Sequence, residues 1–257
     1  MATVDLSIYY AFARSGGTLL NRCLGCVSGN LVLSEVNPHQ SVMPVEQQAH
    51  QWLGLIDEEE HGALQAKSYA EKIRAVLGKA IDRGKQLILR DWCSVNFLPL
   101  PRPHQTQPSG VLEQPLYLER IGVRLRAIVF ARRAASVYTS LALPSFDLAS
   151  FARAYLDYAR AVYALPVFHY EAFCANPAEQ FPRICQALAV PYDSFFLHEF
   201  ARFQNCTGDM ANRANPTAPV NRKHIAPVSP PRSNPRYVAA LQDSLCQEAD
   251  RLLGYAN

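Results

Sequence analysis

Short apolar runs typical of buried strands alternate along this chain with segments that have the spacing of amphipathic helices. The strand-like runs are residues 6–11, 31–33, 86–90, 124–131 and 167–170. The helical patterns begin at residue 18 and recur over residues 69–83, 134–141, 146–164, 177–188 and 237–253. Because parallel strands need long crossover connections, this order predicts an α/β fold with a mostly parallel central sheet flanked by helices. We expect residues 1–257 to form a single domain.

Charge and hydropathy narrow the classes of partner. The formal net charge is +3 with Lys and Arg scattered, which gives little support for nucleic acid or an anionic membrane as partner. No apolar run approaches the ~18–20 residues that span a bilayer, and no signal peptide pattern opens the chain, so we expect a cytoplasmic protein. Seven irregularly spaced cysteines predict neither a disulfide framework nor a metal site.

The turn after the first strand has the spacing of a phosphate-binding loop. Residues 11–18 read AFARSGGT, which follows the Walker A pattern GxxxxGK[ST] with Ala11 at the first glycine and Gly17 at the lysine. Thr18 is the expected N-cap of the helix that follows. Amides at such a turn form an anion site, to which Arg14 adds a planar positive group. The missing lysine counts against ATP chemistry, and a turn without any ligand stays an alternative.

Six segments resemble, in the same order, those of the P-loop sulfotransferases, which use 3′-phosphoadenosine 5′-phosphosulfate (PAPS). RSGGTLLNR at 14–22 is similar to the family's 5′-phosphosulfate loop, and Arg132 followed by Ser140 resembles its 3′-phosphate motif. Of the other four, LSEVNPH and LILRDW resemble segments of bacterial members, and HYEAFCANPAEQF and TGDMANR resemble the family's YEDLxxxP and late TGDxxxxR stretches. Ala134 and Ser136 replace the family's usual Pro and Asp, a change of turn geometry that removes no phosphate ligand.

The resemblance implies a P-loop NTPase-like fold and a sulfuryl transfer from PAPS to a hydroxyl or amine of a small-molecule or carbohydrate acceptor. In doubly wound sheets the carboxyl ends of neighbouring strands meet around a crevice, so two distant motifs can hold the two ends of one nucleotide. The residues implied to bind the co-substrate are Arg14, Ser15, Gly16, Gly17, Thr18, Leu19, Arg132, Ser140 and, in a late basic loop, Arg222 and Lys223.

Sulfuryl transfer to a hydroxyl needs a general base and positive groups near the reacting oxygen. Glu35, which follows the second strand, is our first choice of base by the same resemblance, and His39 is the second. Arg14 supplies positive charge, while Arg90 and Asp91 either orient the acceptor or form a structural ion pair. Many bacterial members have a His after this Arg-Asp-Trp, where the chain has Cys93, so no catalytic His is expected there.

Two other functions remain compatible with the sequence. A P-loop small-molecule kinase would share the turn, although the missing lysine disfavours it. A non-catalytic nucleotide-binding protein would need the phosphate ligands but no base. The loops at 99–115 and 207–235 are expected to shape the acceptor pocket, and nothing in them identifies the acceptor.

Overall fold

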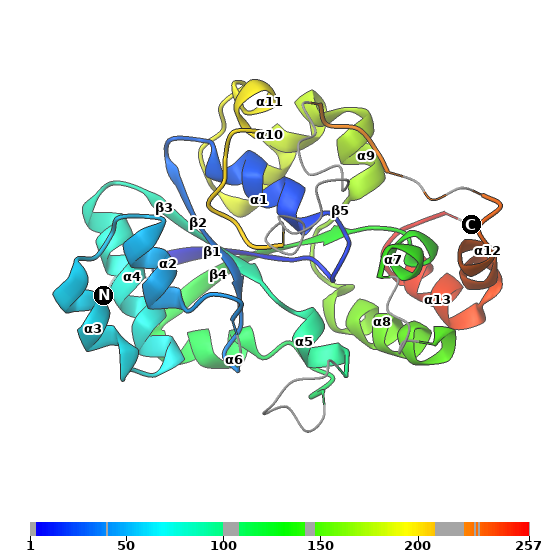
Figure 1. Ribbon diagram of the computed structural model, residues 1–257, viewed down its shortest axis with the longest axis horizontal. Helices are drawn as coiled ribbons and strands as arrows, with labels where there is room; N and C mark the ends of the chain where they lie inside the picture. The colour runs from blue at the N-terminus through cyan, green and yellow to red at the C-terminus, as the bar shows by residue number, and fades with distance from the viewer. Residues whose placement is uncertain are drawn as a thin grey trace.

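A five-stranded parallel sheet forms the centre of the molecule (Figure 1). The computed structural model describes residues 4–39, 41–99, 108–141, 147–208, 224–228, 230 and 232–256. The strands are β1 (Val4–Tyr10), β2 (Asn30–Val36), β3 (Gln86–Asp91), β4 (Val123–Ala131) and β5 (Val167–His169). They lie in the order β2-β3-β1-β4-β5, and each neighbouring pair is parallel. The predicted α/β class is confirmed.

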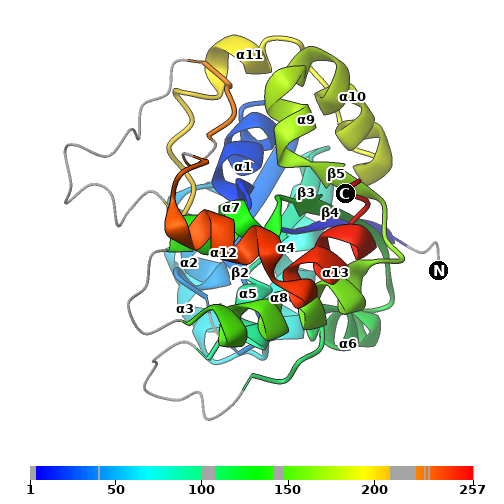
Figure 2. The same ribbon diagram turned by 90° about the vertical axis from the view of Figure 1, so that its right-hand side faces the viewer.

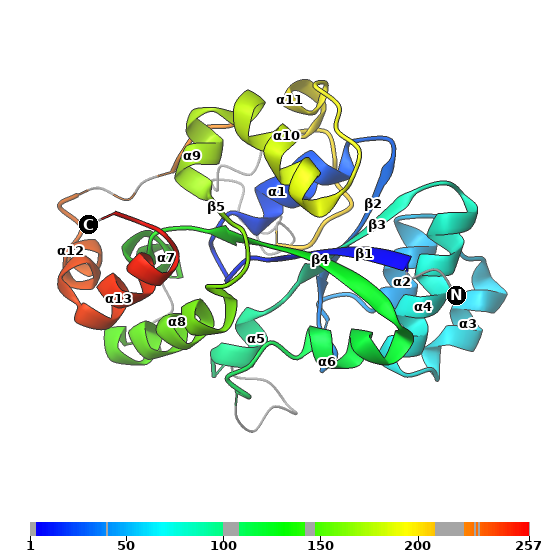
Figure 3. The same cartoon turned by 180° about the vertical axis from the view of Figure 1, so that it is seen from behind.

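Helices cover both faces of this sheet (Figures 1 and 3). One face carries α1 (Gly17–Gly25), α9 (Tyr170–Ala175), α10 (Pro177–Leu188) and α11 (Phe196–Glu199). The other carries α4 (Tyr69–Asp82), α5 (Ser94–Phe97), α6 (Gln114–Leu118) with the 3₁₀ turn Glu119–Ile121, and α8 (Leu148–Val162). The helices α2 (Val45–Gln51) and α3 (Glu58–Gln65) lie at the β2 edge. Within the described residues, no helix is both long and apolar enough to cross a bilayer.

The C-terminal helices pack beside the carboxyl end of β4 (Figure 2). Here α7 (Ala134–Leu141) contacts α12 (Pro235–Gln242), and α13 (Ser244–Leu252) contacts α7 and α8. The sequence predicted one helix over 237–253, but the chain is extended at Asp243, which divides it into two. The Asp243 carboxylate accepts a hydrogen bond from the Cys246 amide and so begins a new helix.

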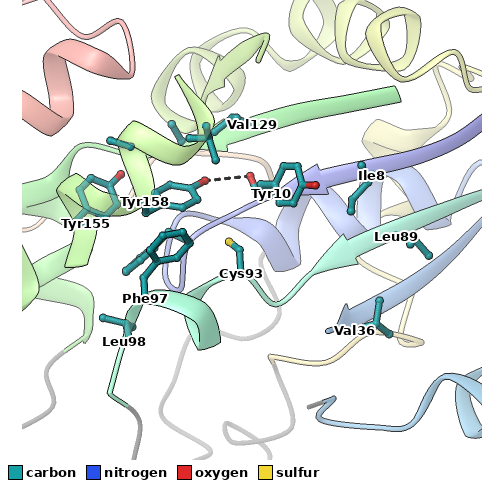
Figure 4. Packing of buried hydrophobic residues seen from close by; sticks show 14 of the residues in the cluster. Ile8, Tyr10, Val36, Leu89, Cys93, Phe97, Leu98, Val129, Tyr155 and Tyr158 are labelled. Carbon is teal, nitrogen blue, oxygen red and sulfur yellow. Dashed lines mark hydrogen bonds between the residues drawn. The ribbon is translucent and has the colours of Figure 1, made fainter. Parts of the chain in front are cut away.

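The end of β1 is fixed by a buried aromatic cluster (Figure 4). Successive strand residues point to opposite faces, and both faces of β1 are covered, so Tyr9 and Tyr10 are each fully buried in different layers of the core. The hydroxyl of Tyr158 on α8 donates to the Tyr10 carbonyl at 3.4 Å. The Phe12 ring packs edge-on against Tyr155 at 5.0 Å. The loop after β1 therefore starts from a rigid base.

Candidate functional site

The loop after β1 carries polar groups at the start of α1. Gly16 is the N-cap of α1 in the left-handed conformation (φ 90°) and offers no side-chain cap, which corrects the predicted N-cap Thr18. The amides of Gly17, Thr18 and Leu19 lie in the first turn, where an α-helix has no internal acceptors. Among the described residues the buried Ser15 hydroxyl has no hydrogen-bond partner. These groups fit an anion such as a phosphate or phosphosulfate.

Two glycines of this loop have close neighbours from other elements of the fold. A Cβ on Gly16 would lie 2.4 Å from the Tyr170 ring, besides the strain of its positive φ. A Cβ on Gly17 would lie 3.0 Å from the Arg90 Nε and 3.0 Å from the Ala11 Cβ. Gly17 occupies the position of the Walker lysine, so a guanidinium from the end of β3 lies beside the place where that lysine would begin.

The loop after β4 lies directly against the loop after β1. Arg14 donates from Nε to the Ser140 hydroxyl at 3.0 Å, and Arg132 donates from Nη1 to the Arg14 carbonyl at 3.0 Å. The Arg132 side chain is buried, stacks over the Tyr170 ring at 4.8 Å and also donates to the Val228 carbonyl. Its Nε has no hydrogen-bond partner within the described residues. The structure thus brings together the two motifs that lie 118 residues apart.

Glu35 lies at an irregular point of β2, close to the loop after β1. Its φ is 49°, and the pairing of β2 with β3 shifts register between Leu33 and Val36. The Glu35 carboxylate pairs with Arg90 at 2.7 Å, with both side chains largely buried. Arg90 is the same group that lies beside Gly17, so it links the expected base to the anion site.

The peptide around Ser34 holds this irregularity in place. The buried side chain of Gln48 accepts from the Ser34 amide at 2.7 Å and donates to the Ser34 carbonyl at 2.9 Å. The Ser34 hydroxyl lies 2.9 Å from the Thr207 hydroxyl and accepts from the Thr207 amide at 3.0 Å. A backbone outlier that is fixed by four hydrogen bonds of this kind is typical of a functional position.

Asp91 and His39 lie apart from this centre. Asp91 points to the face opposite Arg90, where its carboxylate accepts from Asn37 at 3.2 Å, and burial raises its pKa to about 8. The suggested ion pair between Arg90 and Asp91 is therefore wrong, because Arg90 pairs with Glu35. His39 is half exposed, and its Nε2 contacts the Glu113 carboxylate just before α6.

Some residues of this region carried no role in the sequence analysis. Gln48 lies in α2 outside any motif, so no sequence signal marks it. Tyr170 and Thr207 fall inside segments that resemble the sulfotransferases, and that resemblance could have drawn attention to them. Arg222 and Lys223 lie outside the described residues.

The fold and the loop define a parallel α/β protein with a P-loop-like turn that lacks the lysine. Neither family models nor curated proteins give a match to this chain. Among solved structures, the sulfotransferase domain of the Synechococcus PCC 7002 olefin synthase has a TM-score of 0.58 at 16% identity, covering 100% of this chain and 97% of that domain.

The sulfotransferase domain from the curacin biosynthetic pathway gives a TM-score of 0.59 at 13% identity, covering 99% of each chain. The mouse sulfotransferase SULT7A1, complexed with PAP, has a TM-score of 0.41 at 11% identity over 98% of this chain and 83% of its own, which is too low to support an argument. The chain therefore has the fold of sulfotransferase domains, which confirms at the level of the fold the resemblance seen in the sequence.

Proposed function

We propose that this protein is a sulfotransferase that transfers a sulfuryl group from PAPS to a hydroxyl or amine of a small-molecule or carbohydrate acceptor. The observation that carries the proposal is the direct contact between the two anion-binding loops, through Arg14 with Ser140 and Arg132 with the Arg14 carbonyl. A nucleotide with phosphate groups at both its 3′ and 5′ positions needs two such sites close together. The fold shared with two sulfotransferase domains supports the same function.

In this proposal each loop holds one end of the nucleotide. The α1 amides, Ser15 and Arg14 would bind the 5′-phosphosulfate, because a helix N-terminus with an unpaired hydroxyl favours an anion. Arg132 would bind the 3′-phosphate through charge-assisted hydrogen bonds, with the Ser140 hydroxyl as a further donor. Arg222 and Lys223 are further proposed ligands of the 3′-phosphate.

Glu35 is the proposed general base. PAPS supplies the sulfuryl group, and Glu35 would take the proton from the acceptor hydroxyl or amine. Arg90 contacts Glu35 and lies beside Gly17, so it is placed to orient the carboxylate and to add the positive charge that the Walker lysine would otherwise provide. The buried Asp91 faces away, and its raised pKa of about 8 keeps it protonated at neutral pH, which favours Glu35 over it.

The setting proposed for this enzyme is the cytoplasm, as a single domain of residues 1–257 with no nucleic acid partner. All seven cysteines are free thiols, and six of them are buried. Free thiols are usual where glutathione and thioredoxin keep proteins reduced, which supports a cytoplasmic location.

Thermal unfolding with added nucleotides tests the binding part of this proposal. Adenosine 3′,5′-bisphosphate should raise the melting temperature far more than AMP or ATP, because only it can occupy both loops. Ligand at ~100 times its dissociation constant should stabilise the protein by about 2.7 kcal/mol. Equal shifts with AMP would contradict a 3′-phosphate site, and a larger shift with ATP would favour the kinase. Transfer of labelled sulfate to an acceptor then separates an enzyme from a binding protein.

A further inference from the structure

Carboxylates from two later elements hold the start of α7. The amide of Ala134, the first residue of α7, donates to the Asp250 carboxylate of α13 at 2.8 Å. The amide of Arg133 donates to the Glu171 carboxylate of α9 at 3.3 Å. The hydroxyl of Tyr255 also donates to Glu171, at 2.8 Å. The turn between β4 and α7 is thus fixed from the C-terminal side of the fold, where α13 lies beside α7 (Figure 2).

The Asp250 carboxylate gives a hydrogen-bond acceptor to an amide that this sequence leaves at the start of α7. Ala134 stands where the resembling family usually has Pro, which suits the first helical position because it has no N–H there. Alanine leaves an amide at a fully buried site, and a buried donor without an acceptor costs about 1–3 kcal/mol. The Asp250 side chain, itself 11% exposed, supplies the acceptor.

The held turn lies between the two proposed 3′-phosphate ligands. Arg132 is two residues before Ala134, and Ser140 lies on α7 six residues after it. The Arg132 carbonyl also accepts from the Tyr155 hydroxyl at 2.5 Å, so the turn is anchored on both sides of Arg133. A change in the direction of α7 would move Ser140 relative to Arg132.

We propose that Asp250 is a positioning residue for the 3′-phosphate loop, which it orients through the amide of Ala134. This inference rests on the proposed function, because it assumes that Arg132 and Ser140 bind a 3′-phosphate. Asp250 itself would not touch the nucleotide. Its role is to replace, from α13, the restraint that a Pro at position 134 would supply.

The ratio of affinities for adenosine 3′,5′-bisphosphate and AMP, measured by calorimetry, tests this role. Asp250→Ala should weaken adenosine 3′,5′-bisphosphate about five-fold and leave AMP unchanged, the size expected for loss of a helix cap. Asp250→Asn keeps the acceptor oxygen and should preserve the ratio. Asp243→Ala is the matched control, because it removes the N-cap of the same helix, whose hydrogen bond goes to the Cys246 amide within α13. It should also preserve the ratio.

A second substitution separates the proposed positioning role of Asp250 from a general loss of stability. Ala134→Pro alone should lower the ratio, because the proline ring would collide with the Asp250 carboxylate that lies 2.8 Å from the amide nitrogen. In the Asp250→Ala background the carboxylate is gone, so the same Pro meets no collision and removes the unpaired amide. The ratio of affinities should then return to the wild-type value. This sign reversal is expected only if Asp250 acts through that amide.

The outcomes separate this inference from the function on which it rests. Wild type that binds both nucleotides equally would overturn the proposed function and this inference together. Wild type that discriminates, with Asp250→Ala discriminating equally well, would overturn the inference alone, as would an equal loss in Asp243→Ala. If Asp250→Ala does not fold, the double variant decides: restored discrimination supports the role, and a folded double variant without discrimination overturns it.

Discussion

The loops after β1 and β4 meet at one edge of the sheet but are held in different ways. The turn of the first is set by local backbone bonds, because the Ser15 amide donates to the Phe12 carbonyl at 3.0 Å and the left-handed Gly16 begins α1; Arg132 adds a bond to its Arg14 carbonyl. The second is held by partners that are remote in the chain. Glu171 and Asp250, which bind its amides, lie 38 and 116 residues away from the residues they hold.

This difference separates what each loop needs in order to form. A local loop depends on backbone conformation, so its weak point is a residue whose φ or size cannot change. A loop with distant anchors depends on the packing of other elements, so its weak points include residues that do not contact a ligand. The same edge of the sheet therefore responds to substitution in two ways.

The largest expected effect lies in neither loop and separates chemistry from binding. Glu35→Gln should lower turnover about 10²–10⁴-fold, the usual contribution of a positioned base, because an amide cannot accept the proton. Binding of adenosine 3′,5′-bisphosphate should stay within a few-fold. The assay is transfer of labelled sulfate to an acceptor found by screening.

His39→Ala is the control for this assay, and it should keep its activity. Normal turnover in Glu35→Gln together with an inactive His39→Ala would make His39 the base instead. If both variants were active, the base would lie elsewhere, with Asp91 the next to test.

Gly16→Ala should disrupt the local loop most strongly. The substitution combines a left-handed φ with a Cβ 2.4 Å from the Tyr170 ring, so we expect a loss of about 2–4 kcal/mol in the free energy of unfolding. Binding of AMP and adenosine 3′,5′-bisphosphate should fall together, because both use the first loop. Gly78→Ala, in α4 with open space around its Cα, should instead raise stability slightly. An unchanged stability for Gly16→Ala would refute the local account.

Arg132→Ala should affect the second loop selectively. Affinity for adenosine 3′,5′-bisphosphate should fall by about 1.5–3 kcal/mol, the range for a hydrogen bond to a charged group, and affinity for AMP should barely change. Calorimetry with both nucleotides measures the two losses. Equal losses would show that Arg132 acts through its bonds to the Arg14 and Val228 carbonyls and is structural.

The smallest expected effect is a pH dependence of stability that comes from Asp250, an anchor of the second loop. Burial raises the pKa of Asp250 from its ordinary 3.8 to about 6. Between these values the folded state binds a proton that the unfolded state has lost, so stability falls as pH rises from about 4 to 6. Relative to Asp250→Asn, wild type should lose about 1–3 kcal/mol across that range in urea unfolding. Parallel pH profiles for both proteins would contradict a buried, titrating anchor.

The sequence alone predicted the parts of this protein that depend on neighbouring residues. Alternation of strand and helix patterns predicted the parallel sheet, and α10 begins and ends where its apolar spacing and Pro177 indicated. The loop after β1 was recognisable because its spacing follows the Walker A pattern, and the left-handed φ at Gly16 is a local backbone requirement that glycine meets. The N-cap at Thr18 was misplaced by two residues, because a glycine in the left-handed conformation can begin a helix without a capping side chain.

Tertiary structure alone decided which side chains meet. Sequence spacing placed Glu35, Arg90 and Asp91 at adjacent strand ends, but only the pleat and the register shift in β2 put Arg90 with Glu35 and turned Asp91 away. The partners of the Arg133 and Ala134 amides came from α9 and α13, which no local pattern could indicate. A hydrogen bond within one turn is a property of a few consecutive residues, whereas a buried amide takes whatever acceptor the packing of distant helices brings to it.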